Sequence, residues 1–78
     1  MTNKYLYLRI NSGLEGFLRI AGMLRRKRFE VNSVSMERNS AKSASVVIGI
    51  PHEDQFLRAK NFLEKLVDVT EVKEEKGK

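Results

Sequence analysis

The 78-residue sequence predicts a single α+β domain with elements in the order β-α-β-β-α-β. Two segments, residues 14–27 and the stretch that opens at His52, carry apolar residues every three or four positions, as amphipathic helices do. Four shorter segments alternate apolar with polar residues or are rich in β-branched residues, as strands are: 4–10, 30–36, 43–50 and 67–73. Turn-forming residues separate these segments, so each is interpreted as one element.

The first strand and the first helix are predicted from the alternation and spacing at the start of the chain. Leu6, Leu8 and Ile10 alternate with aromatic or polar residues, so they form the buried face of a strand. Asn-Ser-Gly follows as a turn from which the helix begins, because Asn and Ser cap helix N–H groups. We expect the buried stripe of this helix to contain Leu14, Phe17, Leu18, Ala21 and Leu24, with Ile20 and Met23 at its margins.

The second half of the chain predicts a hairpin, a helix and a last strand. In the first strand of the hairpin, Val34 and Met36 share one side, whereas Phe29 and Val31 share the other. The polar stretch ERNSAKSA is expected to form the hairpin loop. The second helix buries an apolar stripe that consists of Phe56, Ala59, Phe62, Leu63 and Leu66.

This order of elements describes the ferredoxin-like arrangement, in which two helices cover one face of a four-stranded antiparallel sheet. Residues 1–73 would form this domain, and residues 74–78 are predicted to be a flexible charged tail. Four apolar side chains are expected on the uncovered face of the sheet or beside its edge: Tyr5, Tyr7, Phe29 and Val31. Exposed apolar patches favour association, so we expect a homodimer or larger assembly through a sheet edge or a helix interface.

The sequence contains no set of residues typical of an enzyme active site. It has no cysteine and a single histidine, His52, without a neighbouring serine, cysteine or second histidine for a proton relay. The segment NSGLEG matches neither a Walker motif nor a dinucleotide-binding fingerprint. We therefore predict a non-catalytic protein whose candidate small-ligand site is the loop Asn11–Gly16, since N–H groups at a helix start bind anions.

The net charge is +5, and cationic residues gather at the expected end of the first helix. Arg25, Arg26, Lys27 and Arg28 follow one another there, where cations interact favourably with the helix dipole. An alternative interpretation is a docking surface for an acidic partner, with Arg25, Arg26 and Arg28 as its candidate residues. RNA binding is disfavoured, because the strand 43–50 lacks the alternating aromatic residues on which an RNA-recognition motif stacks bases.

Neither a membrane span nor a secretory signal is predicted. No apolar run approaches the roughly 20 residues that a membrane-spanning helix needs. The N-terminus also lacks the basic and then apolar layout of a signal peptide. We therefore expect a soluble cytoplasmic protein without a membrane partner.

Three segments of the sequence are similar to strings of residues that occur together in one protein family. Residues 22–36, GMLRRKRFEVNSVSM, are similar to the string Gly-Leu-Phe-x-x-Arg-Gly-[Tyr/Phe]-Asn-[Ile/Val]-x-Ser-[Leu/Met]. INSGLEGFLRIAG is similar to Asn-x-x-Gly-x-Leu-x-Arg-[Ile/Val], and LEKLVDVTEVK to Leu-x-Lys-Leu-x-x-Val-x-x-Val. These strings are those of ACT domains in the small regulatory subunits of acetolactate synthase (acetohydroxyacid synthase), which the chain resembles over nearly its whole length.

This resemblance implies an ACT domain that pairs side by side with a second copy and binds an amino acid at that interface. The effector-binding residues would be Asn11, Ser12, Gly13, Leu14, Glu15 and Gly16 of the first loop, with Glu30 and Val34 around the second strand. It also implies a chain without a cofactor, which activates the large acetolactate synthase subunit in branched-chain amino acid biosynthesis. Thiamine diphosphate would belong to that large subunit.

Three positions depart from the pattern of this family. In an ungapped alignment from Gly22, Glu15 stands at the loop glycine, Arg28 at the glycine before the aromatic residue, and Glu30 at the usual asparagine. A carboxylate that faces the carboxylate of valine would oppose binding, although a one-residue shift would bring Gly13 or Gly16 near the loop position. The chain is thus most similar to the short small subunit of the valine-insensitive isozyme, and we expect activation rather than feedback sensing. The alternative is a freestanding ACT domain that senses an amino acid or another small anion.

Overall fold

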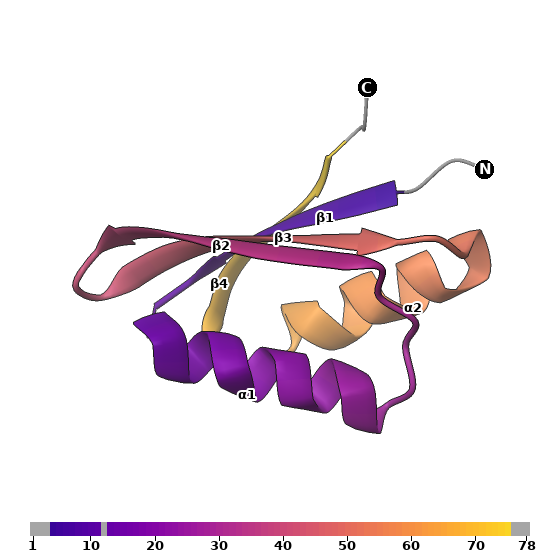
Figure 1. Cartoon of the computed structure of the whole chain (residues 1–78), viewed down its shortest axis with the longest axis horizontal. Coiled ribbons are helices and arrows are strands. Elements are labelled where there is room, and N and C mark those ends of the chain that lie inside the picture. The colour runs from indigo at the N-terminus through magenta and orange to yellow at the C-terminus, as the bar shows by residue number, and fades with distance from the viewer. Residues whose placement is uncertain (1–3, 12, 76–78) are drawn as a thin grey trace.

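The computed structural model describes residues 4–11 and 13–75 and forms two layers, a sheet and a pair of helices (Figure 1). In chain order the elements are β1 (Lys4–Ile10), α1 (Gly13–Arg26), β2 (Ser33–Ser40), β3 (Ser43–Ile50), α2 (Glu53–Glu64) and β4 (Val69–Glu75). The strands form one antiparallel sheet in the order β2-β3-β1-β4, and both helices cover the same face (Figure 1). The predicted ferredoxin-like βαββαβ fold is therefore confirmed.

The core lies between the helices and one face of the sheet. β1 contributes the alternating residues Leu6, Leu8 and Ile10, as predicted, and none of them is exposed. The remaining buried hydrophobic residues come from β3 and the two helices: Ala44, Val46, Ile48, Ile50, Ile20, Leu24, Phe56, Ala59 and Leu63. Burying each large aliphatic or aromatic side chain contributes about 1.5–3 kcal/mol, so this single layer dominates the stability.

The outer strands depart from the predicted boundaries. β2 begins at Ser33 rather than at residue 30, and continues to Ser40 through polar residues that were predicted to be loop. It does so because Glu37 and Arg38 pair with β3 through their backbones, while their side chains stay solvated at the sheet edge. β4 begins and ends two residues later than predicted, at Val69 and Glu75, so it extends into the segment expected to be a tail.

The buried face of α1 is rotated relative to the predicted stripe. Leu14 and Leu18 were expected in the core, but they are 59% and 58% exposed. The face that meets the sheet consists of Gly13, Gly16, Ile20 and Leu24, at spacings of three and four residues. A hydrophobic pattern assigns glycine to neither face of a helix. The prediction therefore missed that Gly13 and Gly16 lie on the face of α1 that packs against the sheet.

α1 ends in a Schellman motif, which stops the helix and turns the chain toward β2. Arg28 is left-handed with φ 64°, and its N–H donates to the carbonyl of Arg25 at 3.0 Å. The N–H of Phe29 reaches back to the carbonyl of Leu24 at 3.1 Å. Phe29 then packs near Phe62, with 6.1 Å between ring centroids. Phe29 and Val31 were predicted on the uncovered face of the sheet or beside its edge. They do not lie on the uncovered face, because both pack against the core, and both lie near Val34 of the edge strand β2.

Candidate functional site

The predicted loop Asn11–Gly16 lies where β1 passes into α1. The N–H of Asn11 is already used, since it donates to the carbonyl of Asp68 at 3.0 Å. Gly13 is left-handed with φ 46°, and a Cβ at this position would lie 4.0 Å from the carbonyl oxygen of Ala41. Leu14 and Glu15 are exposed and Gly16 is buried, whereas Ser12 lies outside the described residues. The loop therefore lies beside the turn that joins β2 to β3.

Glu30 and Val34 lie at the other end of α1. The Glu30 carboxylate contacts Nε2 of His52 at 2.9 Å, and the Glu30 N–H donates to Oε1 of Gln55 at 2.8 Å. α1 has 14 residues. At 1.5 Å per residue it spans about 21 Å between the loop and the segment that holds Glu30. Within one chain, the structure does not bring Glu30 and Val34 close to the described residues of the loop.

The outer edge of β2 is unpaired and lies beside exposed apolar side chains. β2 pairs with β3 on one side, and all of its residues except Met36 are exposed. A groove of about 190 Å³ runs between this strand and α1. Its lining residues are Ala21, Leu24, Arg25, Phe29, Val31 and Val34. We call these residues, together with Leu14 and Leu18, the α1–β2 surface; an unpaired strand edge next to apolar side chains is suited to association.

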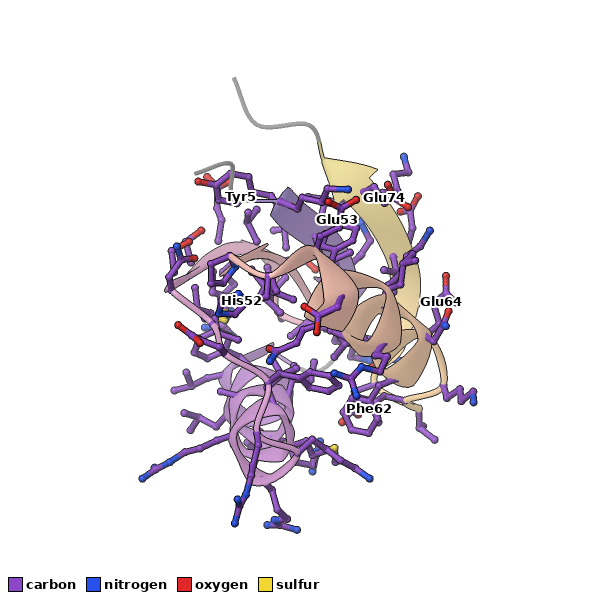
Figure 2. All side chains as sticks on the ribbon, turned by 90° about the vertical axis from the view of Figure 1, so that its right-hand side faces the viewer. Tyr5, His52, Glu53, Phe62, Glu64 and Glu74 are labelled. Atoms are coloured by element: carbon purple, nitrogen blue, oxygen red, sulfur yellow. The ribbon has the colours of Figure 1, made fainter. Side chains whose placement is uncertain are left out.

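The basic cluster occupies the last turn of α1 and the Schellman motif that follows. Its four residues are exposed, and in the part of the chain that the structure describes none of them forms an ion pair. Lys27 lies over the ring of Phe62, with Nζ 5.5 Å from the centroid. In Figure 2, nitrogen-tipped side chains fan outward around the lower end of the molecule, where α1 lies. Arg19 differs from the cluster, because its Nε donates to Asp68 at 2.8 Å.

The lone histidine has a structural partner. His52 stands at the N-cap position of α2, but its side chain does not cap the helix and instead contacts Glu30. Among residues 4–11 and 13–75, no three His, Asp or Glu side chains gather closely enough to hold a metal ion. Over the same residues, neither helix is long and apolar enough to cross a membrane.

The face of the sheet opposite the helices carries a polar network that sequence reasoning missed. Tyr5 and Tyr7 lie on this face, as predicted, and Tyr5 is labelled there in Figure 2. The hydroxyls of Tyr7 and Ser45 are 2.9 Å apart, and Nδ2 of Asn39 donates to the same Ser45 oxygen at 2.8 Å. The hydrogen bond with Ser45, followed by the nearby Arg9 guanidinium, lowers the pKa of Tyr7. Alternation within each strand would have placed Tyr7, Arg9 and Ser45 on one face, but their contacts depend on strand register.

Comparisons with known proteins agree with the fold. The model of a family described as ACT domain matches residues 13–72. The ACT domain from GTP pyrophosphokinase of Chlorobium tepidum superimposes with a TM-score of 0.75 at 9% identity, covering 95% of this chain and 97% of that one. Its solution NMR structure gives 0.75 at 11% identity, with 94% and 84% covered. The structured domain of Caenorhabditis elegans BMY-1 gives 0.68 at 16% identity, with 97% and 95% covered. A search of curated proteins found no match.

Proposed function

The chain belongs to the ACT domain family, and we propose that it is the non-catalytic small subunit of an acetolactate synthase. In this role it binds the large catalytic subunit in the cytoplasm and raises its activity in branched-chain amino acid biosynthesis. Thiamine diphosphate belongs to the large subunit, and this chain contributes contacts rather than reacting groups. ACT domains are regulatory modules, which supports the general part of this proposal.

The observation that carries the proposal is the backbone conformation of Arg28. The ungapped alignment with acetolactate synthase small subunits puts Arg28 at the position where that family has glycine before an aromatic residue. In this chain the residue is left-handed with φ 64°, a conformation that glycine adopts most easily, and Phe29 follows it. The turn that the family's glycine would favour is thus present at the matching position, which supports the register of the resemblance through Gly22–Met36.

We further propose that two copies pair through the β2 edge. A two-fold axis beside the middle of β2 would align the two strands antiparallel and continue the sheet across both copies. The start of one β2 would then lie beside the end of the other. Glu30 and Val34 of one copy would approach the loop Asn11–Gly16 of its partner. The predicted effector residues, which are separated within one chain, would meet only in this dimer.

The contacts of Glu30 favour activation over feedback sensing in this proposal. Its side chain is held by His52, and its N–H by Gln55, so neither group is free for an effector. Glu15 is exposed on the loop that would face a bound carboxylate, and like charges oppose binding. Isothermal titration with valine, leucine and isoleucine should therefore show no tight binding. Tight valine binding would overturn this preference.

Co-expression tests the central proposal. The chain should co-purify with an acetolactate synthase large subunit and raise its turnover, whereas the chain alone should have no activity. Unchanged turnover of the large subunit at saturating amounts of a folded chain would refute the proposed role. Sedimentation of the chain alone tests the homodimer separately.

A matched pair of leucine substitutions tests the proposed interface. Leu18 lies on the α1–β2 surface, whereas Leu57 lies on α2, and both are 58% exposed. Leu18→Lys should therefore shift the assembly toward monomers at micromolar concentration, and Leu57→Lys should not. Equal effects of the two substitutions on sedimentation would contradict pairing at this surface.

The basic cluster is the proposed docking site for an acidic patch on the large subunit. Reversing the charges of Arg25, Arg26 and Arg28 should abolish stimulation without unfolding the chain, as judged by circular dichroism. A control that reverses three other exposed cations has the same net charge: Lys42, Arg58 and Lys65. If both triple variants stimulate equally, the cluster serves solubility and not docking.

A further inference from the structure

The sheet face opposite the helices contains a hollow that the proposed function does not use. The hollow has a volume of about 650 Å³, which lies within the range of small-molecule sites. The lining residues that matter for its chemistry are Tyr7, Arg9, Glu37, Asn39, Ser45 and Val47. They come from β1, β2 and β3, and the α1–β2 surface lies on the other side of the sheet. We call this feature the open-face hollow.

Hydrogen-bond donors converge at the centre of the hollow. The Ser45 oxygen accepts from Nδ2 of Asn39 at 2.8 Å and shares one proton with the Tyr7 hydroxyl at 2.9 Å. Two hydroxyl groups supply two protons and their mutual contact uses one, so the other proton remains for a further acceptor. The second N–H of the Asn39 amide is also a donor. The network therefore holds its side chains in place and keeps donors for an oxygen ligand.

Two irregularities in the sheet frame the same end of this face. The register between β2 and β3 shifts between Arg38 and Ser40, and the Asn39 side chain between them reaches Ser45. The register between β1 and β4 shifts between Arg9 and Ile10, where the Thr70 hydroxyl donates to the carbonyl of Arg9 at 3.0 Å. Bulges strengthen the twist and redirect side chains, often beside binding sites. Here one bulge supplies a donor to the hollow.

The charges of one cross-strand row define the ligand. Glu37 on β2, Ser45 on β3, Arg9 on β1 and Glu71 on β4 follow one another across the sheet. The Glu71 carboxylate pairs with Nζ of Lys73 at 3.1 Å and also neighbours Arg9 across the strand pair. The exposed Arg9 guanidinium lies by the Tyr7 hydroxyl and, with five N–H donors, keeps donors for a ligand. Guanidinium groups bind carboxylates through two parallel hydrogen bonds. Glu37 lies two strands, or about 10 Å, from Arg9 and disfavours ligands with a second negative charge.

We propose that the open-face hollow binds a small monocarboxylate, with Arg9 holding the carboxylate and the Tyr7–Ser45 pair donating a hydrogen bond to it. Val47 and the Tyr7 ring provide the apolar surface for the rest of a small ligand. Glu37 disfavours phosphate and dicarboxylates, which carry a second negative charge. This site does not depend on the proposed acetolactate synthase role.

NMR titration of the full ¹⁵N-labelled chain tests the site. Propionate and lactate are the probes, propionamide is the uncharged match, and succinate and inorganic phosphate are the dianionic comparisons. We expect saturable shifts of the Tyr7, Arg9 and Ser45 amides with the monocarboxylates, with Kd in the millimolar range or below, and no shifts with propionamide. Loss of one charge-assisted contact in Arg9→Gln should weaken binding by about tenfold or more. Glu37→Gln should strengthen succinate binding.

Arg58→Gln is the control, because it removes the same charge from an exposed arginine on α2, outside the hollow. It should leave the Kd of the monocarboxylates unchanged. Absence of saturable shifts at about 50 mM ligand, far above the expected Kd, would overturn the proposal. Equal weakening by Arg9→Gln and Arg58→Gln would also overturn it, because binding would then follow net charge. Should Arg9→Gln unfold, Tyr7→Phe removes the donated proton alone and should raise the Kd several-fold.

Discussion

Replacing Arg28 with glycine should stabilise this protein, because the residue stands in a conformation that carries a steric cost. Its φ of 64° brings the Cβ of any L-residue close to the backbone carbonyl oxygen. Glycine has no Cβ and avoids that contact. The two hydrogen bonds of the turn, from Arg28 to Arg25 and from Phe29 to Leu24, involve backbone atoms alone. They are therefore retained in Arg28→Gly.

The expected gain follows from two opposing terms. A left-handed conformation costs a non-glycine residue about 1–2 kcal/mol, whereas the greater freedom of glycine in the unfolded chain costs about 0.5–1 kcal/mol. The difference is about 0.5–1 kcal/mol in favour of Arg28→Gly. For a domain of this size, 1 kcal/mol raises the Tm by about 4–8 °C, so we expect an increase of about 2–8 °C.

Arg28→Ala is the matched control, because it removes the same charge and keeps the Cβ. Any favourable interaction of the arginine with the α1 carbonyls is lost equally in both variants. Urea unfolding, followed by circular dichroism with a common slope, should therefore rank Arg28→Gly above Arg28→Ala by about 0.5–1 kcal/mol. If Arg28→Gly is no more stable than Arg28→Ala, the left-handed backbone at this position carries no steric cost, and the reasoning is refuted.

Three further predictions concern glycines and the open-face network. Gly49→Ala should lower the free energy of unfolding by about 1–3 kcal/mol in urea, because its Cβ would lie 2.9 Å from the Tyr5 ring and 2.5 Å from a Ser33 oxygen. Gly22→Ala should raise it by about 0.5–1 kcal/mol, since that Cβ meets nothing within 4 Å; a loss of stability there would contradict an open helix surface. Ser45→Ala should raise the pKa of Tyr7 back toward 10.0, measured by tyrosinate absorbance, because Ser45 is the largest cause of its lowering. Since the pKa is lower in the folded state, ionised Tyr7 favours folding only in alkaline solution, and stability at neutral pH should not depend on this titration.

The central strands could be predicted from the sequence because their side chains decide their environment. Leu6, Leu8 and Ile10 alternate with polar or aromatic neighbours, and only one register buries all three. β2 could not be predicted this way, since an edge strand is held by backbone pairing to β3 and its side chains remain in water. The sequence therefore predicted a loop at Glu37 and Arg38, whereas the structure has both residues in β2.

The candidate sites depend on contacts between distant segments, which local patterns do not encode. Glu30 and His52 are 22 residues apart, and nothing around either residue identifies the other as its partner. The open-face hollow likewise depends on a bulge that turns Asn39 toward Ser45. The departure of Arg28 from the glycine of the resembling family was visible in the sequence, but its meaning required the backbone angle.

Arg28 also connects stability with the proposed docking. An arginine at a position that favours glycine reduces stability. A sequence can keep such a residue for two reasons: its side chain has another role, or the loss of stability is too small to impair function. The two explanations differ in their consequence for stimulation of the large subunit. If the guanidinium docks on an acidic patch, Arg28→Gly yields a more stable chain that stimulates less. If the cluster only solvates the helix end, the same variant is more stable and stimulates as well as the original chain.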